Sequence, residues 1–136
     1  MSVIAFLIFF AATSIIFLGA DALMLGFVIG PMFRAALQDS LLQGLRPAAA
    51  IGFYLLYMAG ITYFAGLPAL RAGSANIALL NGLILGLVAY GTYELTSWSV
   101  MRDWHVGMVA TDMLWGAALT GVAAYCGARI SLAFAV

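Results

Sequence analysis

The sequence contains no lysine and little charge of either sign. Five arginines balance five acidic residues, and charged residues make up only 7% of the 136-residue chain. Proteins that attract nucleic acid or anionic lipid headgroups do so through clusters of basic residues, and the chain has no such cluster. We therefore expect no nucleic-acid partner.

Histidine and cysteine each occur once, as His105 and Cys126. A single cysteine cannot form an internal disulfide, and a single histidine without a second ligand makes a poor metal or haem site. The sequence also lacks a glycine-rich phosphate loop, a cysteine pair and a serine–histidine–aspartate set. We expect no metal and no cofactor. Whether the protein is an enzyme stays open, and these absences lean against it.

Hydrophobic residues are the abundant component of the chain. They make up 66% of it, and the mean hydropathy is +1.15. A soluble domain is roughly 45–50% apolar and about 25% charged. So short a chain has too much surface to hide this many apolar side chains from water. The solvent for most of the chain is therefore lipid.

Four apolar stretches are long enough to cross a bilayer as helices, which takes about 20 mostly apolar residues each. They are residues 3–29, 48–67, 76–98 and 106–127. The second and third connections are short, and short connections place neighbouring spans antiparallel. The sequence predicts an all-α polytopic membrane protein, a single domain over residues 1–136 built as a bundle of four transmembrane helices.

The first connection is too polar to cross the membrane. Within residues 32–45, apolar side chains recur at every fourth position: Phe33, Leu37, Leu41 and Leu45. This spacing is typical of a short amphipathic helix that lies at the membrane surface. Pro31 and Pro47 flank the segment, at positions where a helix can begin but not continue. We predict a short interfacial amphipathic helix between the first and second spans.

Pairs of small residues four positions apart occur in three of the spans. They are Gly26 with Gly30, Gly82 with Gly86, and Ala117 with Gly121. Small residues let helix backbones approach closely in lipid, where no hydrophobic drive brings helices together. Each pair is a candidate contact between helices.

The distribution of arginine indicates an orientation in the membrane. The first and third connections lie on one side and carry three arginines, whereas the other side carries two: Arg34, Arg46 and Arg102 against Arg71 and Arg129. Cytoplasmic loops are the richer in arginine. Three arginines on one side against two on the other favour an orientation in which the first and third connections are cytoplasmic and both termini lie outside.

Three acidic residues lie inside the predicted spans: Asp21, Glu94 and Asp112. Because the spans alternate in direction, all three lie roughly 6–12 Å from the membrane face that carries the first and third connections, at a rise of about 1.5 Å per residue. An isolated charged acid in hydrocarbon costs a few kcal/mol. These acids must therefore face the bundle interior, pair with a cation or hydroxyl, or be protonated. We predict that they form one polar core in one leaflet.

Aromatic side chains fall in the same layer of the membrane. The second span contributes two tyrosines, Glu94 has aromatic neighbours at i,i+4 spacing on both sides, and Asp112 has one three residues later. We predict these residues as the walls of a ligand pocket: Tyr54, Tyr57, Tyr90, Trp98 and Trp115. Arg102 and His105 are the predicted rim of the pocket, at the membrane surface.

Simpler interpretations of the same residues stay open. Asp21 and Asp112 can bond to tyrosine hydroxyls or to an arginine and only fix the register of the helices. His105 can cap the turn before the fourth span. Trp98 and Trp104 can anchor the chain at the membrane interface, where tryptophan is common.

Four stretches, one in each span, carry a family resemblance. They are DALMLG at 21–26, GFYLLY at 52–57, GLVAYGTYELT at 86–96 and DMLWG at 112–116. Together they resemble an uncharacterised family of small bacterial membrane proteins, the domain of unknown function numbered 2177. The family pattern has Trp at the position of Met24, Asp at Glu94 and Asn at Ser97. The resemblance implies a four-span bacterial protein, which we expect in the inner membrane, and it implies no established activity.

Three functions fit these predictions. The first, which we favour, is binding of a small molecule, cation or lipid at the layer of carboxylates and aromatic side chains, with or without transport. The second is an intramembrane enzyme, or an accessory subunit of lipid modification, that uses buried carboxyls as acid and base. The third is a structural subunit whose acids fix helix packing. The expected partners are the lipid bilayer, a ligand and, because four spans enclose little volume, a second copy of the chain in a homodimer.

Overall fold

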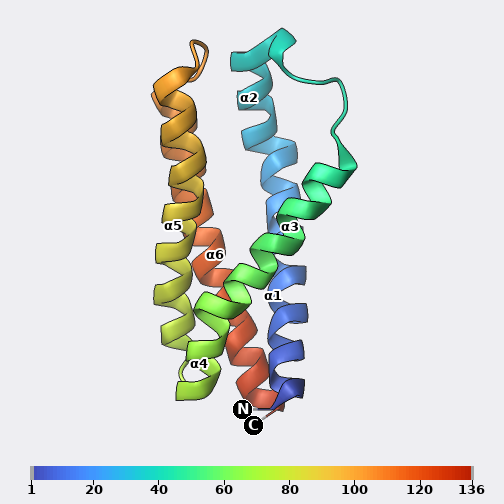
Figure 1. Cartoon of the computed structure of the whole chain (residues 1–136), viewed down its shortest axis with the longest axis vertical. Coiled ribbons are helices and arrows are strands. Elements are labelled where there is room, and N and C mark those ends of the chain that lie inside the picture. The colour runs from blue at the N-terminus through green and yellow to red at the C-terminus, as the bar shows by residue number, and fades with distance from the viewer. Residues whose placement is uncertain (1, 136) are drawn as a thin grey trace.

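The computed structural model describes residues 2–135, and nearly all of them are helical. Figure 1 shows helical rods that run along one axis, with both termini at the same end. Four of these rods are long and apolar enough to cross a membrane. The predicted all-α membrane architecture is confirmed, and no strand interrupts it within the described residues.

Two of the four rods are composite, and two are single helices. The first rod joins α1 (Val3–Met24), a π-helical segment (Leu25–Ile29) and α2 (Gly30–Leu37), and ends in a 3₁₀ turn (Gln38–Ser40). The second joins α3 (Pro47–Ile61), a π-helical segment (Thr62–Gly66) and α4 (Leu67–Ala72). The third and fourth are α5 (Ala75–Val100) and α6 (Val106–Phe134).

The separate interfacial helix predicted over residues 32–45 is not confirmed. α2 continues the first rod past Pro31 as far as Leu37, and after the 3₁₀ turn the chain reaches α3 through a non-helical connection. Pro31 lies in the first turn of α2, where a helix tolerates the missing N–H group. The apolar side chains Phe33 and Leu37 pack against Trp104, before the start of α6.

Both π-helical segments lead into a proline, Pro31 in the first rod and Pro68 in the second. After each segment a backbone N–H group donates to the carbonyl five residues earlier: Gly30 to Leu25, and Leu67 to Thr62. Each wider turn keeps backbone groups paired on the approach to a residue that has no N–H to donate. The rods therefore pass through their prolines as continuous spans.

The carbonyl that Pro68 leaves without a donor is that of Phe64, four residues earlier. The side-chain amide of Asn81, on α5, donates to this carbonyl with an Nδ2–O distance of 3.0 Å. An unpaired carbonyl is costly in lipid, so this bond supports the second rod at its proline. The rod extends to Ala72, beyond the expected end at residue 67, and Gly73 ends it with a φ of 67°, a conformation that favours glycine.

α5 and α6 approach each other through small residues on both helices. A Cβ atom on Gly82 would lie 2.9 Å from the Cα of Gly121, and a Cβ on Gly86 would lie 2.8 Å from the Cα of Ala117. Real Cβ atoms do not come this close, so glycine is required at both positions. The structure therefore confirms two of the three predicted small-residue contacts.

The third pair, Gly26 with Gly30, makes no contact between helices. A Cβ on Gly26 would meet open space, whereas a Cβ on Gly30 would meet the backbone carbonyl of Leu25 in its own rod. Gly30 is needed for the π-helical turn rather than for a neighbouring helix. A glycine can be required for contact with another helix or for a turn within its own helix, and the spacing of small residues alone does not distinguish the two.

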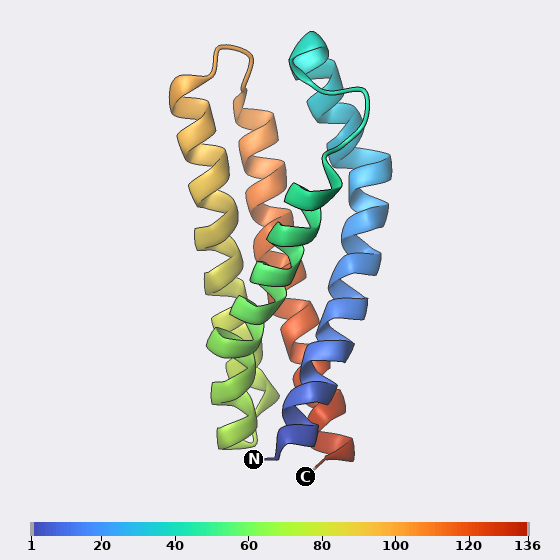
Figure 2. The ribbon, with the colours of Figure 1, turned by 45° about the vertical axis from the view of Figure 1, so that its right-hand side comes forward.

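The rods pack in an unequal way. α6 lies against both α5 and α1, whereas α3 crosses the bundle obliquely, as Figures 1 and 2 show. A large apolar cluster, which includes Phe9, Phe17 and Ile61, joins all four rods. A smaller one joins α2 to the start of α6 around Trp104 and Met108. Asp21 bonds to two side chains that pack against the large cluster, and Glu94 bonds to Trp104 in the smaller one.

Candidate functional site

Asp21 connects three of the four rods. It lies near the end of α1 and is 5% exposed. The Tyr54 hydroxyl on α3 donates to its Oδ2 at 2.7 Å, and the Trp115 indole N–H on α6 donates to its Oδ1 at 3.1 Å. Both donors are neutral, so the negative charge of an ionised Asp21 is spread over hydrogen bonds rather than cancelled by a cation. This arrangement fits the structural interpretation of Asp21, and it also places two aromatic side chains at fixed positions.

Tyr57, a predicted wall residue, lies one turn deeper in α3 and belongs to the apolar core. Its hydroxyl pairs with Oγ1 of Thr120 on α6 at 2.8 Å, and its ring packs edge-on against Phe17 at a centroid distance of 5.5 Å. Phe53 stacks on the other side at 5.4 Å. Tyr57 therefore supports the site from behind and does not line the cavity described below.

Glu94 is fully buried, with 0% of its surface exposed. The indole N–H of Trp104, in the connection between α5 and α6, donates to its Oε1 at 3.0 Å. Its second oxygen, Oε2, is buried and has no hydrogen-bond partner among the described residues. The carboxyl of Asp112 on α6 lies beside that of Glu94, so two acids from neighbouring helices form a pair.

A cavity of about 490 Å³ lies next to this pair. All four rods contribute to its lining, which consists of Asp21, Leu25, Ile29, Phe53, Tyr54, Ala89, Tyr90, Tyr93 and Asp112. Two carboxyls and three tyrosines thus face a space that is otherwise apolar. Binding sites for small molecules are commonly of this kind, concave and mostly apolar with a few polar groups that orient the ligand.

The cavity opens on the outer surface of the bundle. Leu25, Phe53 and Tyr93 line it and are each about half exposed, so they mark its opening. Leu25 and Ile29 belong to the π-helical segment of the first rod, and π-helical turns often occur at functional sites. The opening is bordered by apolar and aromatic side chains, as expected of a surface in contact with lipid.

The predicted site residues therefore fall into groups. Asp21, Asp112, Tyr54 and Tyr90 line the cavity together, and Trp115 holds Asp21 from α6. The remaining predicted residues lie elsewhere: Glu94 behind Asp112, Tyr57 in the core, and Trp98, Arg102 and His105 outside the lining.

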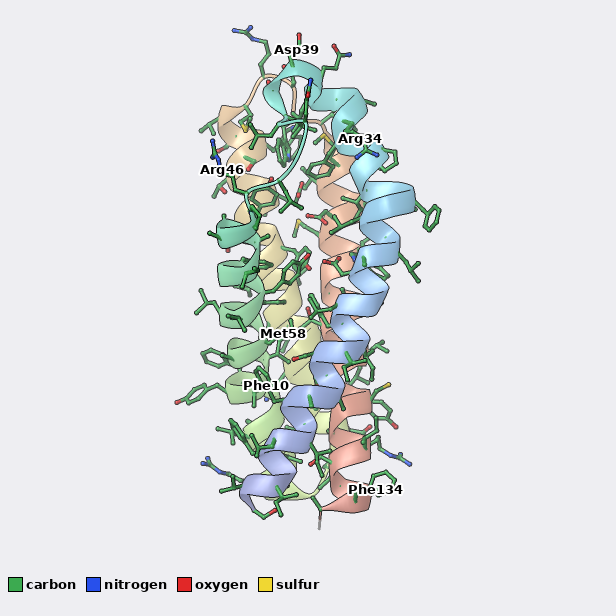
Figure 3. All side chains as sticks on the ribbon, turned by 90° about the vertical axis from the view of Figure 1, so that its right-hand side faces the viewer. Phe10, Arg34, Asp39, Arg46, Met58 and Phe134 are labelled. Carbon is green, nitrogen blue, oxygen red and sulfur yellow. The ribbon has the colours of Figure 1, made fainter. Side chains whose placement is uncertain are left out.

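The residues predicted for the rim do not border the cavity. Arg102 is exposed in the connection before α6. His105 caps α6, because its Nδ1 accepts a hydrogen bond from the Met108 backbone N–H at 3.4 Å. Trp98 is 46% exposed, as an interfacial anchor would be. Figure 3 shows Arg34 and Arg46 towards the end of the molecule that carries the α2–α3 connection, opposite Phe134.

Sequence reasoning missed Trp104, Tyr93 and Phe53. Trp104 is 5% exposed and bonds to Glu94, and the ring of Tyr93 packs edge-on against it at 5.4 Å. A tryptophan near a span end ordinarily indicates an interfacial anchor, and that interpretation is wrong for Trp104. One signal was present in the sequence: a tight connection returns the chain past the end of α5, so a residue in it can reach back to Glu94.

The fold and the cavity define a class of protein: a polytopic helical membrane protein with a mostly apolar cavity between its spans, into which two carboxyls face. Residues 6–129 match the family described as "Predicted membrane protein (DUF2177)", and the chain belongs to this family. The match covers nearly the whole chain and confirms the resemblance noted in the sequence. Neither a curated protein nor a solved structure matches the chain.

Proposed function

We propose that this protein binds a small amphipathic molecule or lipid that carries a cationic group, in the cavity beside Asp112. The observation that carries the proposal is a carboxyl in an apolar cavity that opens towards lipid. A carboxylate attracts a cation strongly in such surroundings, and the aromatic walls formed by Tyr54, Tyr90 and Tyr93 favour a cation further through their ring faces.

Asp112 supports a ligand-binding role better than the other two acids do. Among residues 2–135, the hydrogen bonds from tyrosine and tryptophan reach Asp21 and Glu94, and none reaches Asp112. Asp112 nevertheless lines the cavity. We therefore assign Asp21 to positioning the walls and Asp112 to contacting the ligand.

The route into the cavity is lateral, from the bilayer. Its opening lies between Leu25, Phe53 and Tyr93, and exposed apolar residues surround the bundle. The cavity lies in the half of the molecule nearest the first and third connections, which carry three of the five arginines. We propose an inner-membrane protein whose cavity opens to the cytoplasmic leaflet, with both termini outside. A path across the whole membrane would need more enclosed volume, which a homodimer would supply.

The test uses dodecyltrimethylammonium, an amphiphile with a fixed positive charge, and the purified protein in lipid nanodiscs. Binding is measured by titration calorimetry against empty nanodiscs of the same lipid. We expect Asp112→Asn to weaken binding about tenfold or more, because a hydrogen bond or ion contact with a charged group contributes roughly 1.5–3 kcal/mol. Asp39→Asn is the matched control, since Asp39 is exposed in the 3₁₀ turn.

Equal binding by wild type and Asp112→Asn would contradict the proposal, as would equal binding of dodecanol, which has the same chain and no charge. Failure of both Asp112→Asn and Asp21→Asn to assemble would instead favour the structural role. Native mass spectrometry of the same samples gives the number of chains in each particle and so tests the homodimer.

The adjacent carboxyls of Glu94 and Asp112 favour a second candidate, an intramembrane enzyme or accessory subunit of lipid modification. Two carboxyls in different surroundings, one fully buried and one at a cavity, resemble an acid–base pair. This candidate predicts a changed membrane lipid profile in cells that lack the protein. The binding role does not require such a change.

A further inference from the structure

Glu94 lacks a donor for one of its two carboxyl oxygens. It is fully buried, Trp104 donates to Oε1, and Oε2 has no partner among the described residues. An ionised carboxylate has only acceptor sites, and burying one of them without a donor is costly. A second carboxyl, that of Asp112, lies beside it. Two ionised carboxylates cannot satisfy each other, whereas one protonated and one ionised carboxyl can.

The groups around the pair do not supply a compensating cation. The titratable side chains that face it are Asp21 on α1 and Tyr90 and Tyr93 on α5, and the hydroxyl of Tyr54 on α3 is bonded to Asp21. The charged and basic residues of the neighbouring elements are all exposed. They are Arg34 in α2, Asp39 in the 3₁₀ turn, and Arg102, Asp103 and His105 in the connection between α5 and α6. The pair is therefore surrounded by neutral groups and one further acid.

We infer that Glu94 and Asp112 hold one proton between them, and that a cation binding beside Asp112 displaces this proton. The proton resides on Oε2 of Glu94, the more deeply buried residue, and is donated to the Asp112 carboxylate at the cavity. The inference rests on the proposed function and specifies it further: the cavity exchanges a proton for a monovalent organic cation.

The exchange follows from charge. A cation beside Asp112 interacts with one negative charge of the pair when Glu94 is protonated and with two when Glu94 is ionised, so binding of the cation favours loss of the proton. The O–H bond of Glu94 breaks, the electron pair stays on Oε2, and the proton passes to water. The pair then carries two negative charges and the cation one positive charge, which leaves the same net charge as before. By linkage, affinity for the cation rises with pH, by up to about tenfold per pH unit for one proton released.

The sequence provides an unusually direct test, because Glu94 is the only glutamate in the chain. Protein labelled with ¹³C at the glutamate carboxyl is studied by infrared spectroscopy in a maltoside detergent, which has no carbonyl group. We expect a protonated-acid carbonyl band at neutral pH that shifts with the label, is absent in Glu94→Gln, and loses intensity when dodecyltrimethylammonium is added. Absence of a label-sensitive band in the wild type overturns the inference.

Binding measurements separate the inference from the proposed function. Wild type is expected to bind the probe more tightly as pH rises, and Glu94→Gln to bind it with little dependence on pH. The variant keeps the acceptor for Trp104 and leaves the cavity lining unchanged. Asp39→Asn should follow wild type. If the wild type binds the probe and Glu94→Gln shows the same pH dependence, the exchange is wrong and the binding role stands.

Two further outcomes are decisive as well. If the wild type does not bind the probe, the proposed function fails and the exchange fails with it. If Glu94→Gln does not fold, the labelled wild type decides alone: a band that persists at saturating probe contradicts displacement of the proton, and a band that is lost supports it.

Discussion

At the scale of single residues, three acids of similar burial have different surroundings. Asp21 accepts hydrogen bonds from two rods, Glu94 accepts one from a connection, and Asp112 faces the cavity. A charged carboxyl in a membrane span is costly unless it is paired, and the three differ in the donors that reach them among the residues that the structure describes: two for Asp21, one for Glu94, and none from tyrosine or tryptophan for Asp112. Their roles therefore follow from their donors rather than from their depth in the membrane.

The bond between Tyr54 and Asp21 can be tested by removing one hydroxyl. Tyr54→Phe should lower the free energy of unfolding by about 1–2 kcal/mol, because a buried carboxylate loses one of its two donors. Unfolding by sodium dodecyl sulfate in mixed micelles measures the change. Tyr63→Phe is the matched control, since Tyr63 lies in the same rod and is 65% exposed. Equal losses in the two variants would show that the bond contributes nothing to stability.

The acids and their shared layer could be predicted from sequence, with Tyr54 and Trp115 in that layer, whereas the bond from Trp104 to Glu94 was missed. Hydropathy places Asp21, Glu94 and Asp112 inside spans, and alternating direction brings them to one layer. Helical spacing assigned Trp98 to the walls and depth in the membrane assigned Tyr57, although Trp98 is 46% exposed and Tyr57 lies in the core. Which way a ring points across helices depends on packing that spacing does not contain.

At the scale of elements, glycine performs two different tasks. Gly82 and Gly86 bring α5 against α6, whereas Gly30 permits a π-helical turn within one rod. Glycines elsewhere, such as Gly52 on α3, face open space. A substitution by alanine separates these cases, because the added methyl group either collides or merely improves helix propensity.

Gly86→Ala and Gly52→Ala should change stability in opposite directions. At Gly86 the new Cβ would collide with the backbone of Gly116 and Ala117, and overpacking of this kind costs typically 1–3 kcal/mol. At Gly52 it would meet no neighbour, and alanine is the better helix former by up to about 1 kcal/mol. The same mixed-micelle unfolding assay applies. Destabilisation of similar size at both positions would contradict the close approach of α5 and α6.

The bond from Asn81 to the carbonyl of Phe64 is tested by a double-mutant cycle with Pro68. Asn81→Ala should destabilise the wild type by about 1–2 kcal/mol, because it leaves the carbonyl unpaired in lipid. In a Pro68→Ala background the new backbone N–H supplies a donor, and the same change should cost much less. Additive losses would show that Asn81 does not compensate for the proline.

The ends of the rods were harder to predict than their existence. Pro31 and Pro68 each mark a plausible end of a span, and the structure continues through both. The reason is that a π-helical turn and a donor from another helix replace the missing hydrogen bonds. Neither compensation is visible in the local sequence. The amphipathic spacing of residues 32–45 was real, but Phe33 and Leu37 cover α6 and not a membrane surface.

At the scale of the whole molecule, composition and hydropathy were sufficient to predict four spans and an all-α fold. The cavity was not predictable in shape, because side chains of all four rods line it and their packing across helices is not contained in the sequence pattern. One layer of polar residues could be placed in the membrane from sequence. Its division into a cavity, a supporting core and a buried pair required the structure.

The π-helical segment of the first rod has a consequence for the rotational phase of α2. An α-helix turns about 100° per residue, and a π-helical turn inserts one residue more than an α-helical turn would hold. Everything after Ile29 is therefore rotated by about that angle relative to α1. This rotation is what points Phe33 at Trp104, where the rings meet edge-on at 5.2 Å. Removing one residue from the segment would turn Phe33 and the rest of that face of α2 away from Trp104, which donates to Glu94. The length of the π-helical turn therefore contributes to the geometry of the site, as its side chains do.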